Sequence, residues 1–241
     1  MKKAVNMWKM YLPELYQMLV LMLIAEIFGI VLVKIIVSVD HDVEGYAVLG
    51  SFFAMCLGMF VTVMSCCFSY GSKFNLAVSM GCTRKEFFSA HWIGTILFVF
   101  AEIAAVLILG FLETGLGKIM YADTFLSEEL NLLPYLMDYR VVIALLLLVP
   151  SFGIFIGSLM LKFQTKVMWA LWVVWMSAFL GGAKISDVIS ENPDGTLANT
   201  VNSVFHFFKT VTGPALVLMF LVVCAVMLVI SAMLLRKQEV R

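Results

Sequence analysis

The chain has 241 residues, 63% of them hydrophobic and 13% charged, and its mean hydropathy is +1.03. Soluble domains average about 25% charged residues. This composition therefore excludes a soluble globular domain and predicts an all-α integral membrane protein, with residues 1–241 as one transmembrane domain. The formal net charge is zero, and no nucleic-acid partner is expected.

Residues 1–17 form a basic, amphipathic lead-in. Lys2, Lys3 and Lys9 alternate with apolar residues, a pattern typical of a helix that lies in the membrane interface. An ordinary basic flank that only fixes the topology is the alternative. We expect Pro13 to break or bend this helix before the first span. No small-residue cleavage site follows the next apolar run, so a signal peptide is not predicted.

Six apolar stretches are predicted to span the membrane, and they cover residues 18–38, 46–70, 87–112, 140–161, 167–182 and 214–235. The fifth ends at Gly181-Gly182 and has about 16 residues, whereas a span needs about 20. Longer loops separate spans three and four and spans five and six. Each loop carries a stretch that predicts a short helix, Asp123–Met137 on the membrane surface and Thr196–Lys209 at helical spacing.

The distribution of charge predicts the orientation of the chain. Eleven of the 16 Lys and Arg residues lie near the two termini, in residues 72–92 or in the turn at 162–166, and eleven of the 16 acids lie in the other loops. Short loops rich in Lys and Arg stay in the cytoplasm. Both termini and these two connections are therefore predicted to be cytoplasmic.

Motifs of known enzymes are missing from the sequence. It contains no GxxxxGK[ST], HExxH or GxSxG motif. His41, His91 and His206 are far apart, and an interfacial structural role is favoured for His91. The five cysteines form no CxxC pair, so no disulfide framework or metal site is predicted. We expect no enzyme activity and no cofactor on this chain.

Glu26 and Glu102 lie inside predicted spans one and three. An ionisable residue at mid-span costs about 2.5–3.5 kcal/mol, so it normally faces a partner or a wet cavity. We expect the two at different depths, where they need not meet. Either they line a translocation path, or each is protonated or hydrogen-bonded between helices and holds the bundle together.

Gly153 and Gly157 form a GxxxG pair in span four. Such pairs let two helices approach closely. Packing within the chain and dimerisation are both consistent with a single copy of this motif.

Residues 72–92 form the most informative polar interruption. Lys73–Met80 is half apolar and runs into Gly81, which suits a helix C-terminus because glycine tolerates the left-handed conformation. Thr83 and Glu86 have the spacing of a capping box that opens the next helix. The segment is predicted as a short helix, a break and a capped helix that continues into span three.

The run Phe74–Phe88, FNLAVSMGCTRKEFF, resembles the loop after the second span in ABC exporter permeases of the type-2 class. The layout is also similar: six spans, cytoplasmic termini, an amphipathic lead-in and a long outer segment between spans five and six, which in that class often contains short re-entrant helices. Such helices would explain the short fifth span. The chain looks most like the small permeases of peptide or antimicrobial exporters.

The resemblance implies a transmembrane subunit of an ATP-driven exporter in the bacterial cell membrane. A separate ABC ATPase subunit would bind ATP and Mg, a second permease chain, identical or related, would complete the pathway, and a cytoplasmic coupling helix would dock on the ATPase. The substrate would be amphipathic or hydrophobic: a peptide, an antibiotic or a lipid-like molecule. The positions carried over as ATPase-coupling residues are Lys73, Phe74, Asn75, Ser79, Met80, Gly81, Thr83, Arg84, Lys85, Glu86 and Phe87.

Two other classes of function remain open at this stage. One is a substrate-capture membrane subunit of a small-molecule importer, which would bind its ligand tightly and needs no capped cytoplasmic helix. The other is an integral membrane enzyme, against which the lack of paired acids or histidines at one membrane face argues.

Overall fold

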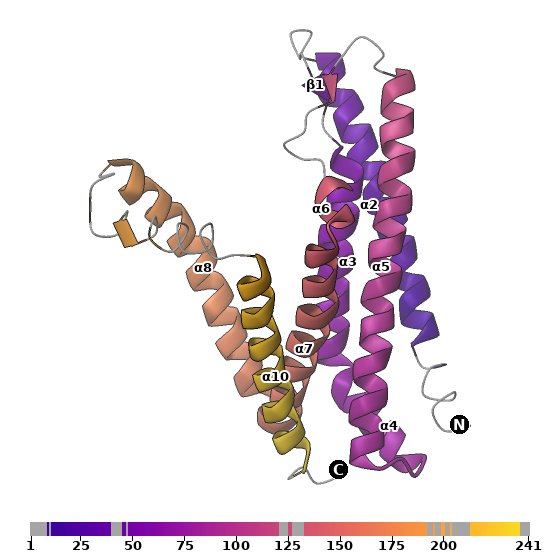
Figure 1. Cartoon of the computed structure of the whole chain (residues 1–241), viewed down its shortest axis with the longest axis vertical. Coiled ribbons are helices and arrows are strands. Elements are labelled where there is room, and N and C mark those ends of the chain that lie inside the picture. The colour runs from indigo at the N-terminus through magenta and orange to yellow at the C-terminus, as the bar shows by residue number, and fades with distance from the viewer. Residues whose placement is uncertain are drawn as a thin grey trace.

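The chain folds almost entirely into helices in the computed structural model (Figure 1). The structure describes residues 9, 11–39, 45–46, 48–120, 125–126, 133–191, 195, 199–200, 203 and 213–236. In chain order the elements are α2 (Leu12–Val39), β1 (Gly45–Tyr46), α3 (Leu49–Phe68), α4 (Tyr70–Ser79), α5 (Arg84–Met120), β2 (Phe125–Leu126), α6 (Leu133–Met137), α7 (Tyr139–Phe163), α8 (Thr165–Glu191) and α10 (Gly213–Arg236).

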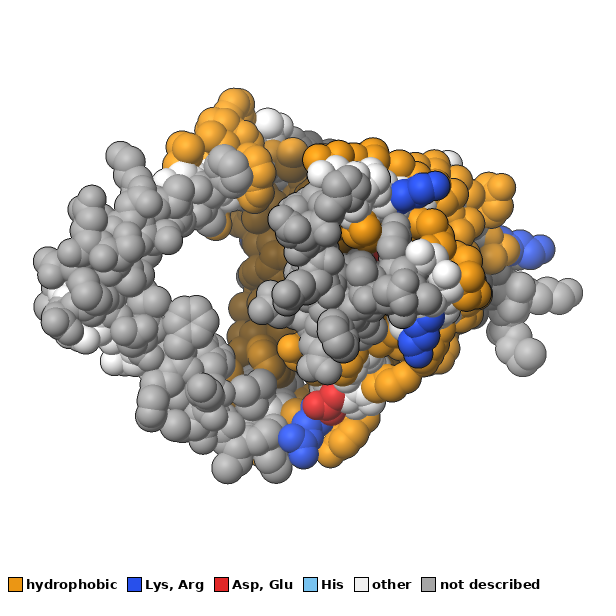
Figure 2. Space-filling model, turned by 90° about the horizontal axis from the view of Figure 1, so that it is seen from above, with side chains coloured by type: hydrophobic (Ala, Val, Ile, Leu, Met, Phe, Trp, Pro, Cys, Tyr) orange, Lys and Arg blue, Asp and Glu red, His pale blue; other side chains and the backbone are white. Residues whose placement is uncertain are grey.

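Within the described part of the chain, five helices are long and apolar enough to cross a membrane: α2, α3, α5, α7 and residues 217–236 of α10. Large apolar side chains such as Ile27, Phe100 and Ile108 are exposed on their outer faces, and hydrophobic side chains make up most of the described surface in the view from above (Figure 2). Water would disfavour such a surface, whereas lipid matches it. The protein is a multi-pass membrane protein.

The central bundle consists of α2, α3, α5 and α7, which run side by side (Figure 1). Helix α10 packs along α7, and α8 contacts α7 but leans away from the bundle. The start of α2, the helix α4 and the end of α10 lie at one end (Figure 1). We call this the α4 end. At the other end β1 and β2 pair in parallel over two residues each.

Several predicted boundaries were wrong. Pro13 does not separate a lead-in from span one, because it lies in the first turn of α2, where a helix needs no backbone N–H from it. Helix α5, which contains the predicted span three (residues 87–112), extends beyond that span at both ends and has 37 residues. The helix that contains the predicted fifth span does not end at Gly181-Gly182, since α8 has 27 residues and continues to Glu191. Helix α8 is not among the five candidate spans, so the six-span layout remains a prediction.

Other predictions lie partly or wholly outside the described residues. The interfacial helix at residues 1–17 is described only at Lys9 and from Tyr11 onwards, where it enters α2. Of the surface helix Asp123–Met137, the structure describes β2 and α6. The helix Thr196–Lys209 falls outside the described residues except at Asn199, Thr200 and Ser203.

The bundle is built around two buried clusters. The first lies between α2, α3, α5 and α6 and contains Met18, Met22, Ala25, Ala54, Phe98, Val99, Ile103, Val106 and Leu136. The second lies at the α4 end, between α4, α5, α7 and α10, and contains Tyr70, Phe74, Ala77, Cys82, Phe87, Ile154 and Leu235. The second cluster connects α4 to three other helices.

Glycines set the closest helix contacts. A Cβ on Gly157 would lie 2.7 Å from the carbonyl oxygen of Cys66, and one on Gly153 would lie 2.8 Å from the Cys66 Cβ. The GxxxG pair therefore packs α7 against α3 within the chain. Helices α2 and α3 approach just as closely, because a Cβ on Gly29 would lie 2.4 Å from the Cα of Gly50.

Candidate functional site at the α4–α5 turn

The break between α4 and α5 has the two caps that the sequence predicts. Gly81 has φ 76°, its N–H donates to Val78, and the N–H of Cys82 donates to Ala77 (2.9 and 3.0 Å). This pair of bonds is a Schellman motif, which closes a helix C-terminus. The turn is thus confirmed as a defined structure rather than a loose loop.

A capping box opens α5 two residues later. The N–H of Thr83 donates to the Glu86 carboxylate at 2.7 Å, and the N–H of Glu86 donates to the Thr83 hydroxyl at 3.3 Å. The two side chains satisfy backbone donors that the first turn of a helix leaves without partners. The prediction from residues 83 and 86 is confirmed.

The predicted coupling residues divide into two groups. Those on the surface, which we call the exposed tip, are Asn75, Ser79, Met80, Gly81, Thr83, Lys85 and Glu86. Lys73, Phe74 and Phe87 are buried, at 6%, 0% and 0% exposure, so they contact other parts of this chain, and their role in coupling stays a prediction. Their alternation with surface residues follows from the helical repeat, which places one face of α4 against α5 and α7.

Four buried aromatic residues form a cluster that we call the buried base: Tyr70, Phe74, Phe87 and His91. Phe74 and Phe87 meet edge to face with ring centroids 5.3 Å apart, Tyr70 meets Phe87 at 5.4 Å, and His91 stacks on Phe87 at 5.4 Å. Rings in these arrangements stabilise one another beyond their burial alone. The buried base fixes α4 on the start of α5.

Polar contacts join the buried base to α2. The Lys73 Nζ donates to the Glu14 carboxylate at 2.5 Å and lies 4.3 Å from the centre of the Tyr11 ring. Glu14 also accepts a hydrogen bond from Ser65, at 2.7 Å. The Tyr11 hydroxyl and the His91 Nδ1 form a further hydrogen bond. Four elements, α2 to α5, therefore meet at Glu14 and His91.

Two tyrosines near this point remain neutral donors and acceptors. Burial raises the pKa of Tyr70 and of Tyr11 above the ordinary value for tyrosine. Tyr70 accepts a hydrogen bond from Ser158 of α7 at 3.3 Å. These uncharged hydroxyls extend the contacts of the buried base to α7.

Arg84, another predicted coupling residue, makes a contact within the chain. Its Nη1 donates to the carbonyl of Arg236, the last residue of α10, at 2.6 Å. Carbonyls at a helix C-terminus carry partial negative charge and favour a cationic partner. Arg84 therefore joins the start of α5 to the end of α10, and Lys85 is the exposed cation of the tip.

The two predicted pathway glutamates are buried between helices. Glu102 is fully buried and accepts a hydrogen bond from Thr62 at 2.9 Å. Glu26 lies beside Gly50, and Glu102 lies beside Gly58. Gly50 comes eight residues before Gly58 in α3. Eight residues correspond to about 12 Å along a helix, so the two sit at different depths, as predicted.

The sequence pattern places Glu113 in the loop after span three, and this prediction was wrong. It lies inside α5, is 6% exposed, and accepts the N–H groups of Gly50 and Ser51 at 2.8 and 2.9 Å. It thus caps the N-terminus of α3 from another helix. The apolar repeat continues past Glu113 to Leu116, a signal that α5 extends further.

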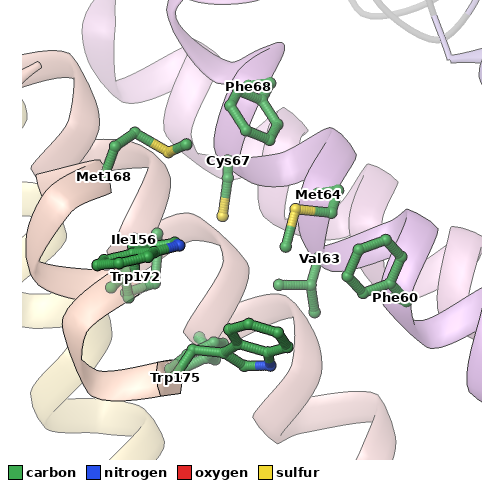
Figure 3. A pocket seen from close by; sticks show the side chains of 11 residues that line it. Phe60, Val63, Met64, Cys67, Phe68, Ile156, Met168, Trp172 and Trp175 are labelled. Atoms are coloured by element: carbon green, nitrogen blue, oxygen red, sulfur yellow. The ribbon is translucent and has the colours of Figure 1, made fainter. Parts of the chain in front are cut away.

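An apolar groove of about 400 Å³ lies between α3, α7 and α8. Met64 and Cys67 of α3 point toward Trp172 and Trp175 of α8 (Figure 3). The described residues that line it are Phe60, Val63, Met64, Cys67, Phe68, Phe152, Ile156, Met168, Leu171, Trp172 and Trp175. Neither Glu26 nor Glu102 is among them.

The described residues give no metal site, since no group of three or more His, Cys, Asp or Glu among them could hold an ion.

The fold places the chain in the class of all-helical multi-pass membrane proteins, with a capped, firmly attached turn at the α4 end. No known protein family, curated protein or solved structure matches it.

Proposed function

We propose that this chain is the transmembrane subunit of an ATP-driven exporter of the ABC type, and that the exposed tip docks on a separate ATPase subunit. The observation that carries the proposal is the construction of the α4–α5 turn. It is closed by a Schellman motif, opened by a capping box and attached by buried aromatic and ionic contacts. Together these contacts would let the turn transmit a displacement to the helices without bending.

Side-chain contacts would transmit a displacement of the exposed tip to the membrane helices. A partner that displaces the exposed tip also moves the buried base, because Phe74 and Phe87 pack against each other. The base is joined to α2 through Lys73 and Glu14 and to α10 through Arg84 and Arg236. Movement of the tip would therefore reach several membrane helices at once, as coupling to ATP hydrolysis requires.

The charge pattern and the apolar groove support the orientation and the kind of substrate that we propose. Concentration of Lys and Arg at the α4 end supports a cytoplasmic position for that end, in a bacterial cell membrane. The apolar groove supports an amphipathic or hydrophobic substrate, such as a peptide, an antibiotic or a lipid-like molecule. A second permease chain would complete the pathway.

The experiment uses a charge reversal at the exposed tip. Lys85→Glu should abolish copurification with the ABC ATPase subunit that copurifies with the wild-type protein, and should reduce ATP-driven export, while the protein still inserts and folds. Lys166→Glu is the matched control, since Lys166 is an exposed lysine in the first turn of α8, outside the tip. Export that is unchanged in Lys85→Glu, or reduced equally in both variants, would contradict docking at the tip.

A small-molecule importer subunit is the second candidate. It would bind its ligand tightly as an isolated protein, without ATP. Saturable binding of a vitamin or metal ion to the purified chain, together with wild-type behaviour of Lys85→Glu, would favour it.

A further inference from the structure

The end of the bundle opposite the α4 end contains a second polar site, formed by Glu26 of α2, Glu113 of α5 and Ser51 of α3. All three are buried, with exposures of 4%, 6% and 1%. The Glu26 carboxyl carbon and the Glu113 Oε1 each lie 3.0 Å from the position that a Cβ on Gly50 would occupy. Two carboxyl groups therefore meet beside Gly50.

The two carboxyl groups have different surroundings. Both oxygens of Glu113 accept backbone N–H groups at the N-terminus of α3, which favours its ionised form because partial positive charge collects there. Among the described residues no donor contacts either oxygen of Glu26, and the Ser51 hydroxyl also has no partner. An ionised Glu26 would be a buried anion next to another anion.

We propose that Glu26 binds a proton in this structure and that the proton joins Glu26 to Glu113 as a hydrogen bond. A proton supplies the donor that the pair lacks and removes the repulsion between two carboxylates. It also needs no space, and the position beside Gly50 offers none, since a methyl group there would already contact both side chains. A hydrated cation or a substrate ammonium is larger than that methyl group.

The charged groups that face Glu26 support a single proton. On α5 the facing charge is Glu113, and on α3 the facing groups are the Gly50 amide and the Ser51 hydroxyl. On α2 itself, Lys34 is exposed eight residues away. Within the described part of the chain no cation reaches the pair, so ionising both glutamates leaves one charge uncompensated.

The proton on Glu26 would affect how closely α2 packs against α3. Gly29 and Gly50 hold α2 and α3 in backbone contact one turn from Glu26. Loss of the proton would place two like charges at this contact and push the helices apart. The proton therefore stabilises the closed arrangement of α2, α3 and α5, and that stability is lost as the pH rises.

Infrared spectroscopy of the purified protein in lipid nanodiscs tests the assignment, because a protonated carboxyl group has its own carbonyl band. At neutral pH the wild type should show a band that Glu26→Gln removes and that disappears on raising the pH; buried glutamates can hold a proton to about pH 8–9. Glu102→Gln is the control and should keep the Glu26 component. A carbonyl region in Glu26→Gln identical to that of the wild type would overturn the proposal.

A second measurement keeps Glu26 in place. Glu113→Gln removes the repelling charge, so the Glu26 band should disappear at a lower pH than in the wild type. The thermal stability of the wild type should fall as the pH rises, and that of Glu26→Gln should stay constant over the same range. An unchanged titration in Glu113→Gln, or an equal fall in both stability curves, refutes the shared proton.

Discussion

The Lys73 Nζ lies 2.5 Å from the Oε2 of Glu14, with side-chain exposures of 7% and 28%. These residues are 59 positions apart in the sequence, and their contact joins α4 to the first turns of α2. Because Lys73 is the more buried member, the two halves of the pair should respond differently to mutation.

Glu14→Gln should destabilise the protein more than Lys73→Met. The first change leaves a buried ammonium without its counterion, whereas the second leaves a partly exposed carboxylate that water can solvate. Breaking a buried pair costs about 3–5 kcal/mol, and replacing both partners is often neutral. Thermal unfolding in detergent should therefore rank the variants Glu14→Gln, Lys73→Met and the double variant, from least to most stable. A double variant less stable than Glu14→Gln would contradict this account.

Gly157→Ala should destabilise the bundle. Its methyl group would lie 2.7 Å from the Cys66 carbonyl and 2.8 Å from the Tyr70 ring, so α7 would have to move away from α3, at a cost of about 1–3 kcal/mol. Gly115→Ala is the matched control, since nothing lies within 4 Å of its Cβ position and alanine favours a helix interior by about 1 kcal/mol. Opposite shifts in the unfolding temperature are expected, and a shift in the same direction would refute close packing at Gly157.

Gly81→Ala and Thr83→Ala should loosen the exposed tip without unfolding the protein. Alanine at φ 76° costs about 1–2 kcal/mol, and loss of the Thr83 cap costs about 0.5–2 kcal/mol. Hydrogen exchange should therefore accelerate in residues 76–88 and stay unchanged in the middle of α5. Ser79→Ala serves as a control because its hydroxyl bonds only to the preceding turn, at Leu76. Uniform acceleration along α5 would mean that the caps do not act locally.

Thr62→Val tests whether Glu102 is structural or belongs to a pathway. The change removes the hydroxyl that donates to the fully buried Glu102 and should cost about 1–3 kcal/mol, and adding Glu102→Leu should recover most of that loss. If Glu102 only holds the bundle, the double variant will retain export. Loss of export in a double variant of normal stability would assign Glu102 to the pathway.

The sequence predicts local features of this protein well. Gly81, Thr83 and Glu86 specify the two caps because each acts on backbone groups within a few residues, so the pattern in the sequence contains the whole interaction. A difference in depth between Glu26 and Glu102 was also predicted, but not which of them lies nearer the α4 end, because that depends on how α2 and α5 are offset along the bundle.

The long-range contacts could not be predicted from the pattern. Lys73 and Arg84 are cations beside a membrane and match an external partner as well as an internal one; only the packing of α2 and α10 shows that their partners are Glu14 and the Arg236 carbonyl. Glu113 was assigned to a loop because acids are rare in spans, and the N-terminus of α3 that it caps is 62 residues away in the sequence.

The length of α5 has one more consequence. Its 37 residues extend about 55 Å at 1.5 Å per residue, and about 52 Å along the membrane normal at the average tilt of about 20°. A bilayer with its headgroups is about 40–45 Å thick. Helix α5 is therefore longer than the bilayer is thick, so at least one of its ends, the first turn with Arg84 and Lys85 or the last turn with Lys118, extends beyond the lipid headgroups.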